Sequence, residues 1–249
     1  MLDHEDRFEA LNRIVKECSN IVFFGGAGVS TASGIPDFRS KDGLYNQHDV
    51  RFDNYSPEYL LSIDCLVDRP NVFFEFYRQK LNVEGIEPNG AHFKLAEMEK
   101  AGKLMGVITQ NIDGLHQKAG STKVAEVHGT TLRNYCSRCD RKVPADFIFK
   151  SETPIPKCPD CGGTIRPDVT LYGESLPQDA WQQALDWVRR ADCLIIGGTS
   201  LVVNPAASLA YMFSGKYLII MNRDSTPRDS AASLVFHEDI ADVMNRIEL

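Results

Sequence analysis

The chain has 249 residues, of which 43% are hydrophobic and 24% are charged. This length suits one large domain, or one domain with a small module, and the balance is that of a soluble globular protein. The 27 basic and 34 acidic side chains leave a formal net charge of −7, which argues against a dedicated nucleic-acid-binding protein. An acidic surface suits basic partners such as lysine-bearing peptides, although solubility alone also accounts for it.

The sequence gives no sign of a membrane segment or an export signal. No apolar stretch reaches the length of a membrane span, and the acidic residues 1–6 lack the pattern of a signal peptide. We therefore expect a cytoplasmic protein with neither a membrane nor a nucleic acid as direct partner. A monomer is favoured.

Helical and extended patterns alternate along most of the chain. Helical spacing falls at residues 8–18, 57–63, 71–81, 91–100, 177–190 and 240–247, and extended runs fall at 21–24, 104–109, 124–127, 169–172, 193–196, 217–221 and 234–236. Such alternation predicts a mostly parallel sheet covered by helices on both faces. Residues 41–90 hold helical patterns but no convincing parallel strand, which indicates an inserted helical module.

The first predicted strand, 21–24, runs directly into a glycine-rich turn. Gly26 and Gly28 fit two positions of the dinucleotide-binding pattern, but Thr31 stands at the third. Glycine allows a sharp turn and the close approach of a diphosphate, and a helix beginning there would direct its free amides at that anion. The turn predicts a nucleotide site, with a purely structural glycine turn as the alternative.

A dehydrogenase is a poor match to the residues after this turn. Its pattern requires an acidic residue at the end of the next strand, whereas this sequence enters the helical module 41–90. Residues 34–39, Gly-Ile-Pro-Asp-Phe-Arg, place a charged pair beside an aromatic ring. A dehydrogenase has no evident use for that arrangement.

Polar residues follow three further predicted strands. At the carboxyl end of a parallel strand such residues point into the crevice where ligands bind. The segments concerned are 110–113 with Gln110, Asn111 and Asp113, then His128 with Gly129, and Thr199 with Ser200. An Asx-rich turn without a ligand and a structural histidine are the alternatives here. The apolar residues 201–203 fit either core packing or an exposed strand that pairs with a peptide.

Four of the seven cysteines form two Cys-x-x-Cys pairs. Cys136 and Cys139 make the first pair, and Cys158 and Cys161 make the second, with 18 residues between the pairs. This spacing predicts a tetrahedral zinc site, over a redox dithiol or unrelated surface cysteines. Four protein ligands leave no open position, so the zinc is expected to be structural. The segment 133–166 is poor in large apolar residues and needs such a metal to fold.

Taken together and in this order, the motifs resemble those of the sirtuins, the NAD-dependent protein lysine deacylases. The resemblance extends from about residue 11 to residue 247. It rests on the segments 26–30, 34–39, 109–113, 128–129, 172–174 and 198–200, and on the four cysteines.

The resemblance implies an α/β fold in which a Rossmann-like parallel-sheet domain carries a smaller inserted domain. The large domain would comprise residues 1–40, 91–132 and 167–249, and the small domain would consist of a helical module, 41–90, and a zinc ribbon, 133–166. The implied cofactors are NAD+, consumed as a co-substrate, and one structural Zn²⁺ per chain held by the four cysteines.

Carried over residue by residue, the resemblance implies an NAD site and three catalytic residues. His128 would be the general base, and Asn111 and Asp113 would form the nicotinamide pocket, where Asp113 binds the carboxamide. The residues expected to bind NAD+ are Gly26, Ala27, Gly28, Thr31, Phe38, Arg39, Gln110, Asn111, Ile112, Asp113, His128, Gly198, Thr199, Ser200, Asn222 and Asp239.

The implied substrates are acyl-lysine proteins or peptides, whose acyl group passes to ADP-ribose while nicotinamide is released. The peptide would pair as a strand with Val169, Leu171, Tyr172, Leu201, Val202 and Val203. An NAD-dependent ADP-ribosyltransferase on the same scaffold is the alternative, and the intact His128 favours deacylation.

Acyl preference is expected to depend on two residues of the helical module. Sirtuins that prefer succinyl or malonyl groups carry a Tyr-x-x-Arg pair, and the corresponding residues here are Tyr77 and Lys80. Lysine lacks the fork with which arginine grips a carboxylate through two hydrogen bonds. We therefore expect the acetyl group to be preferred, with some tolerance for acidic acyl groups.

Overall fold

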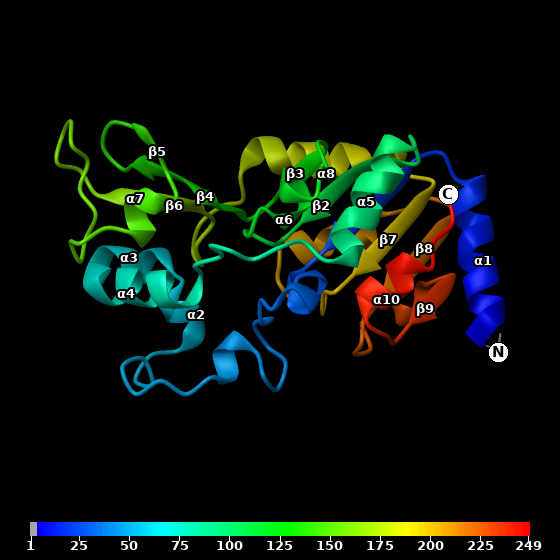
Figure 1. Cartoon of the computed structure of the whole chain (residues 1–249), viewed down its shortest axis with the longest axis horizontal. Coiled ribbons are helices and arrows are strands. Elements are labelled where there is room, and N and C mark those ends of the chain that lie inside the picture. The colour runs from blue at the N-terminus through cyan, green and yellow to red at the C-terminus, as the bar shows by residue number, and fades with distance from the viewer. Residues whose placement is uncertain (1–3) are drawn as a thin grey trace.

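The computed structural model describes residues 4–249, which form a larger and a smaller part (Figure 1). The larger part is built on a six-stranded sheet in the order β3-β2-β1-β7-β8-β9. All five strand pairs of this sheet are parallel. Its strands are β1 (Ile21–Gly25), β2 (Leu104–Thr109), β3 (Val124–Glu126), β7 (Cys193–Gly197), β8 (Tyr217–Met221) and β9 (Leu234–Phe236).

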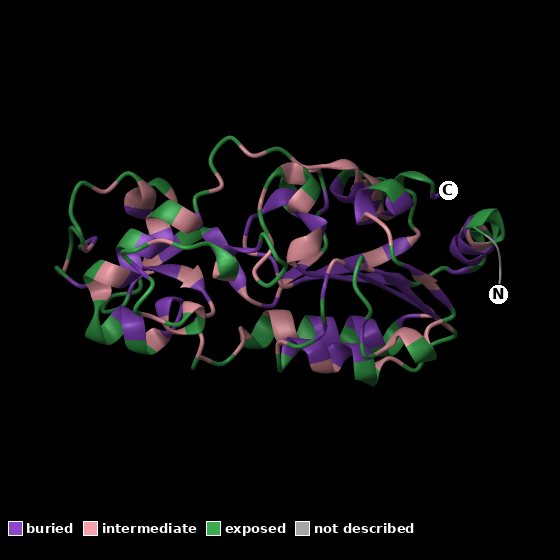
Figure 2. Ribbon diagram, turned by 90° about the horizontal axis from the view of Figure 1, so that it is seen from below, coloured by how far each residue is buried: buried purple, intermediate pink, exposed green. Residues whose placement is uncertain are grey.

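Helices cover both faces of this sheet, as Figure 2 shows by the buried strands between two helical layers. One face packs against α1 (His4–Glu17), α5 (Gly90–Lys100) and α10 (Ile240–Asn245). The other face packs against α8 (Gln178–Arg190) and α9 (Leu209–Met212). A strand buried on both faces needs apolar side chains on both, so β1 reads as a continuous apolar run rather than an alternating one.

The smaller part lies at the left of Figure 1 and contains an antiparallel sheet in the order β5-β4-β6. Its strands are β4 (Gly129–Cys136), β5 (Lys142–Pro144) and β6 (Ile165–Val169). The accompanying helices are α2 (Pro57–Leu60), α3 (Ile63–Asp68), α4 (Pro70–Lys80) and α7 (Asp146–Phe149). A further short helix, α6 (Leu115–Lys118), follows β2 in the larger part.

The two segments of the smaller part share one hydrophobic core although the whole of 91–132 separates them in sequence. Phe73 and Tyr77 of α4 stack with each other at a ring-centroid distance of 5.8 Å, and Tyr77 stacks with Phe149 of α7 at 5.3 Å. The same core includes buried residues of β4 and β6. This supports our proposal that 41–90 and 133–166 form one domain, whose sheet extends beyond 133–166 at both ends.

Most predicted elements are confirmed, and the strands at 104–109, 217–221 and 234–236 have the predicted bounds. The helical pattern expected at 57–63 corresponds to two short helices, because α2 ends at Leu60 and α3 begins at Ile63. Ser62 lies between them and caps α3 by accepting a hydrogen bond from the amide of Cys65 at 3.0 Å. The apolar spacing is continuous here, but a serine cap interrupts the helix.

Two expectations near the ligand-binding edge are also corrected. No α-helix begins after the first glycine turn; residues 27–29 and 31–33 form two single-turn 3-10 helices, which end at Gly34 in the left-handed conformation. The strand expected at 169–172 is displaced, since β6 runs from Ile165 to Val169. The sequence did not predict β4, because polar residues interrupt the apolar alternation of a strand and Cys136 was assigned to the metal site.

Among the helices within residues 4–249, none combines the length and the apolar character that crossing a membrane requires.

Candidate functional site

The site lies where the strand order of the large sheet reverses, between β1 and β7. In open parallel sheets, ligands bind at this point beyond the carboxyl ends of the strands. The turn after β1 and the turn after β7 meet there, and the amide of Gly28 donates a hydrogen bond to the carbonyl of Gly198 at 2.8 Å. The segments that follow β2 and β3 begin at the same edge of the sheet, because these strands are parallel to β1.

The glycines of these turns have a different role from the one the sequence suggested. A Cβ on Gly28 would lie 2.8 Å from the Cα of Gly198, and one on Gly26 would lie 2.8 Å from the Cβ of Thr199. The glycines therefore allow the two turns to pack against each other, rather than only leaving room for a ligand. Gly198 has a φ of +59°, which also favours glycine.

This packing leaves two backbone amides of the first turn without a backbone acceptor. Within residues 4–249, the amides of Ala27 and Thr31 donate to no other backbone group, whereas those of Gly26, Gly28 and Val29 do. The Thr31 hydroxyl donates to the carbonyl of Gly28 at 3.0 Å and so stabilises the turn itself. Free amides beside a close-packed glycine turn fit a diphosphate.

The turn after β2 is tied to both glycine turns. The amide of Gln110 donates to the carbonyl of Gly25 at 3.0 Å, and its side-chain Nε2 donates to Thr199 Oγ1, also at 3.0 Å. Thr199 is buried, whereas Ser200 is exposed. Gln110 therefore spans from β2 across β1 to the turn after β7, which fixes the three turns relative to one another.

A buried polar chain joins the turns after β1 and β2. Asn111 Nδ2 donates to the hydroxyl of Ser30 at 3.0 Å, and that hydroxyl donates to Asp113 Oδ2 at 2.6 Å. The amide of Leu115 donates to the other carboxylate oxygen at 2.9 Å. The three polar side chains belong to residues less than 10% exposed. Such a preorganised chain suits recognition of a small amide group, because each donor and acceptor has a fixed direction. Ile112, between them in sequence, packs at the edge of the core of the smaller part.

His128 follows β3 and faces the same turn. Its Nδ1 lies 3.0 Å from the carbonyl of Gln110, and since a carbonyl only accepts, Nδ1 carries the proton and donates it. The other ring nitrogen, Nε2, is then an acceptor in the neutral ring. Burial lowers the pKa of His128, although the hydrogen bond to Gln110 opposes this effect. A neutral imidazole with a free lone pair can act as a general base near neutral pH.

The Phe38–Arg39 segment contacts the smaller part. Phe38 packs edge-on against Tyr45, with ring centroids 5.4 Å apart. Arg39 Nη2 donates to the hydroxyl of Tyr172 at 3.1 Å, and that hydroxyl also lies 3.1 Å from the hydroxyl of Tyr45. The loop is thus joined to the segment that follows β6.

The two segments expected to contact a peptide differ in their free backbone groups. The amide and carbonyl of Tyr172 bond to Leu61 and Ile63, so they are already occupied within the chain. Leu201 is buried in the core of the larger part, whereas Val202 is 53% exposed and neither of its backbone groups bonds to another backbone group within residues 4–249. Leu201 is therefore core and Val202 is surface, while the pairing of residues 201–203 with a peptide stays a prediction. Val169 and Leu171 are both buried.

Asn222 and Asp239 lie at the far side of the strand ends, beyond β8 and β9. Asn222 Nδ2 donates to the carbonyl of Asp224 at 2.7 Å. Asp239 caps α10 by accepting from the amide of Ala241 at 2.8 Å and also pairs with Arg223. Both side chains therefore have structural partners in the chain.

The acyl-selectivity pair lies in the smaller part. Tyr77 is fully buried in the aromatic stack of α4 and α7, and its hydroxyl has no protein partner within residues 4–249. Burial raises the pKa of this phenol. Lys80 is half-buried, and its Nζ donates a hydrogen bond to Gln47 Oε1 at 3.1 Å.

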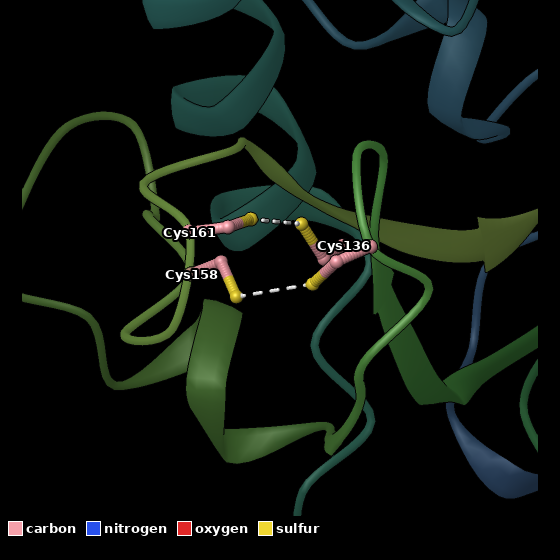
Figure 3. A group of neighbouring side chains, drawn as sticks. Cys136, Cys158 and Cys161 are labelled. Atoms are coloured by element: carbon pink, nitrogen blue, oxygen red, sulfur yellow. Dashed lines mark hydrogen bonds between the residues drawn. The ribbon is translucent and has the colours of Figure 1, made fainter.

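The four paired cysteines converge on one point. Their sulfurs all lie within 4.8 Å of one another. Figure 3 shows Cys136 facing Cys161, and the Sγ atoms of these two residues are 3.5 Å apart. Cys139 and Cys158 are 3.7 Å apart. A tetrahedral zinc with Zn–S bonds of about 2.3 Å separates its sulfurs by about 3.8 Å, so the residues fit this ion. No cysteine within residues 4–249 is in a disulfide.

A buried histidine pair beside the polar chain was missed by the sequence analysis. His92 of α5 and His116 of α6 are 0% and 1% exposed, and their ring centroids are 4.8 Å apart. Burial lowers the pKa of His92 to about 4 and that of His116 to about 3. Ser30 was likewise not assigned a role, although it ends the glycine motif. Neither histidine lies in a recognisable motif, so only tertiary packing reveals the pair.

A doubly wound sheet with glycine turns at its switch point, joined to a four-cysteine module, defines a nucleotide-binding α/β protein. A family model described as the Sir2 family matches residues 26–205. A relative from Clostridium perfringens, named an NAD-dependent protein deacetylase, is 49% identical, and the match covers 98% of this chain and 99% of the relative. The chain belongs to the Sir2 family, the sirtuins.

Solved structures agree with this membership. A structure of Sir2 with a p53 peptide and NAD+ is 39% identical, covers 96% of both chains and has a TM-score of 0.86. A Sir2 variant with a deacetylated p53 peptide and 3'-O-acetyl ADP ribose is 38% identical, with the same coverage and a TM-score of 0.89. The Rossmann-like architecture inferred from the sequence is thereby confirmed.

Replacing one sulfur ligand tests the metal site. We expect Cys158→Ser to reduce zinc below one equivalent per chain and to lower the melting temperature, because the metal joins the turns on which the small sheet depends. Elemental analysis and thermal unfolding measure both. The matched control is Cys65→Ala, a buried cysteine outside the cluster, which should retain one zinc. Full zinc content in Cys158→Ser would contradict the site.

The buried histidine pair predicts a loss of stability in mild acid. Their folded pKa values lie below the ordinary value of 6.5, so below pH 6.5 only the unfolded chain takes up these protons. The stability present above pH 6.5 is therefore lost as pH falls toward about 4, by up to about 1.4 kcal/mol per pH unit for each histidine.

His116→Phe removes one of these groups and should make this slope shallower, as measured by urea unfolding between about pH 4.5 and about pH 7.5. The exposed His48, replaced by Gln, is the control and should leave the slope unchanged. Equal slopes of unfolding free energy against pH for wild type and His116→Phe would contradict the prediction, because they would show that His116 has the same pKa in the folded and the unfolded chain.

Proposed function

We propose that this protein is an NAD-dependent protein lysine deacylase that acts on acetyl-lysine peptides. The observation that carries the proposal is the hydrogen bond from His128 Nδ1 to the carbonyl of Gln110. It leaves Nε2 as a proton acceptor, and Gln110 directly precedes Asn111 of the Ser30–Asn111–Asp113 chain. The relatives named above, an NAD-dependent protein deacetylase and Sir2 with NAD+ and peptide, support the same activity.

NAD+ would lose nicotinamide, and its ADP-ribose would receive the acyl group of the peptide, while one water molecule balances the reaction and the lysine amine is freed. The free amides of Ala27 and Thr31 are suited to hold its diphosphate. Gln110 and Thr199 already share a hydrogen bond and would turn their remaining polar atoms toward a ribose. The other residues assigned to this site are Gly26, Gly28, Phe38, Arg39, Gly198, Ser200, Asn222 and Asp239.

Asn111, Ile112 and Asp113 would form the pocket for the nicotinamide ring. The carboxylate of Asp113 has a fixed position, because Ser30 and the amide of Leu115 each donate to one of its oxygens. Each oxygen retains a lone pair for the carboxamide N–H groups. A buried pocket that grips the carboxamide can hold the ring away from the plane it prefers in water, which favours its departure.

His128 would then accept a proton at Nε2 from a hydroxyl of the ribose. Burial keeps its pKa below the ordinary value, so the ring is neutral at about pH 7 and ready to accept. The hydrogen bond at Nδ1 becomes stronger when the ring is charged, and this stabilises the product of the transfer.

The peptide would lie between the segment that follows β6 and residues 201–203. Val202 supplies exposed backbone for strand pairing, while Val169, Leu171 and Tyr172 would shape the opposite wall. The zinc held by the four cysteines contributes structure only, because four thiolates leave no open position. None of the seven cysteines within residues 4–249 is in a disulfide, which is typical of an enzyme of the reducing cytoplasm.

Replacing the proposed base should abolish deacylation without preventing NAD+ binding. We expect His128→Ala to reduce deacetylation of an acetyl-lysine peptide by about 100-fold or more, because general-base catalysis contributes that much. In the wild type, the rate should rise with pH and level off below the ordinary histidine pKa of about 6.5, since burial lowers the pKa of His128.

Peptide-dependent nicotinamide release and mass spectrometry of the peptide measure the activity, and calorimetry measures NAD+ binding. His48→Ala, at an exposed histidine, is the control. An unchanged rate in His128→Ala would overturn the assignment. Nicotinamide release that is independent of acetyl-lysine, with ADP-ribose transferred to protein, would favour the ADP-ribosyltransferase alternative.

Acyl preference should favour acetyl over succinyl groups. Tyr77 is enclosed in an aromatic stack, and Lys80 offers no bidentate fork for a carboxylate. We expect kcat/KM to be about tenfold or more higher for acetyl-lysine, because a missing bidentate charged pair is worth about 1.5–3 kcal/mol. Lys80→Arg should narrow the gap in matched peptides. A wild type that prefers succinyl-lysine would refute this order.

A further inference from the structure

A partly buried ion pair lies beside the segment proposed to contact the peptide. Arg166 Nη1 and Nη2 donate to the two carboxylate oxygens of Glu174 at 2.6 Å and 2.8 Å. The two side chains are 10% and 23% exposed. A bidentate guanidinium–carboxylate pair fixes direction as well as distance, so Glu174 has one orientation relative to β6.

The same pair holds both ends of the segment 169–174. Arg166 Nη2 also donates to the carbonyl of Val169 at 3.2 Å. Glu174 accepts from the amide of Leu171 at 2.9 Å, and its own amide donates to the carbonyl of Leu171 at 3.0 Å. The ion pair thus closes the segment into a loop whose start, middle and end are linked through one guanidinium and one carboxylate.

Arg166 takes its position from the small antiparallel sheet. It lies on β6 opposite Tyr135 of β4, whose ring centroid is 5.4 Å from the guanidinium carbon. The next pair in the register is Ile165 with the zinc-ligand cysteine Cys136. The guanidinium is therefore attached to a framework that the four cysteines hold, and it transmits that position to the loop.

Packing by other elements accounts for only part of the shape of this loop: it buries Leu171 and bonds the backbone of Tyr172 to Leu61 and Ile63. An open cavity of about 460 Å³ lies on the side of the ion pair, lined by Arg166, Val169, Thr170 and Glu174 among others. A buried ion pair is also a weak source of stability, because an apolar replacement is often neutral or stabilising. Its distinctive contribution is fixed geometry.

We propose that Arg166 and Glu174 are positioning residues for the peptide: they hold segment 169–174 in its binding shape without touching either substrate. This inference rests on the proposed function, in which that segment contacts the peptide. With the loop already ordered, the peptide does not bear the entropic cost of ordering it. Loss of the pair should therefore weaken peptide binding far more than NAD+ binding, because the diphosphate site in the turns after β1 and β7 lies outside this segment, which meets assigned NAD+ residues only at Arg39 and His128.

Glu174→Gln is the primary test, because the amide keeps the size and an oxygen for Leu171 but removes the charge. We expect the KM and the Kd for an acetyl-lysine peptide to rise about tenfold, as for the loss of a hydrogen-bonded charge, with the KM for NAD+ within about twofold of wild type. The control is Asp186→Asn, which neutralises an exposed pair with Arg190 on α8 and should change neither constant.

A double variant separates positioning from stability. Arg166→Gln with Glu174→Gln leaves no unpaired buried charge, so its melting temperature should return toward that of the wild type. Its peptide KM should stay raised, because two amides cannot reproduce the bonds from one guanidinium to Glu174 and Val169. Recovery of peptide KM together with stability would show a merely structural role and overturn the proposal.

Direct binding of a fluorescent acetyl-lysine peptide keeps the two proposals distinguishable. A wild type that binds the peptide but releases no nicotinamide would refute the proposed function, and the same binding comparison would still decide the positioning role. A wild type that releases nicotinamide, with a Glu174→Gln variant that binds the peptide equally well, would refute the positioning role alone.

Discussion

The contact between the two glycine turns at the β1–β7 boundary is the constraint on which the site depends. The Gly28 amide bonds to the Gly198 carbonyl at 2.8 Å, and a Cβ on either residue would collide with the other turn. Because the turns pack backbone to backbone, the side chains around them have no freedom to move apart. Gln110 can therefore reach Thr199, and the Ser30 hydroxyl can join Asn111 to Asp113. A loosely packed turn would leave the same residues too mobile to act as fixed donors and acceptors.

The smaller part is stabilised in a different way, because its two segments contribute to one shared hydrophobic core. The helical segment supplies aromatic residues such as Phe73, and the cysteine segment supplies a sheet that the metal site ties together. Their shared core lies next to the ligand-binding edge, and two polar links reach from it: the Arg39–Tyr172 hydrogen bond and the Arg166–Glu174 pair. The inserted part thus contacts and supports the loops beside the site.

Sequence patterns located the chemistry well but described the local geometry less well. The strands of the large sheet were predicted because residues buried on both faces must be continuously apolar, as in β1 and β8. Strand β4 was not predicted, because polar residues interrupt its pattern, and the α2–α3 break was hidden by a continuous helical period. The glycines were recognised from the sequence, but their close contact with the opposite turn is seen only in the folded structure.

The sequence by itself determined the family, the metal ligands and the set of polar residues at the strand ends, since motif order and spacing are properties of a linear chain. Tertiary structure alone decided how those residues are used. It assigns the proton of His128 to Nδ1 through the carbonyl of Gln110, brings His92 against His116, and closes segment 169–174 with Arg166. Each of these depends on a distance between residues that no local pattern encodes, because packing of the sheet and of the shared small core sets it.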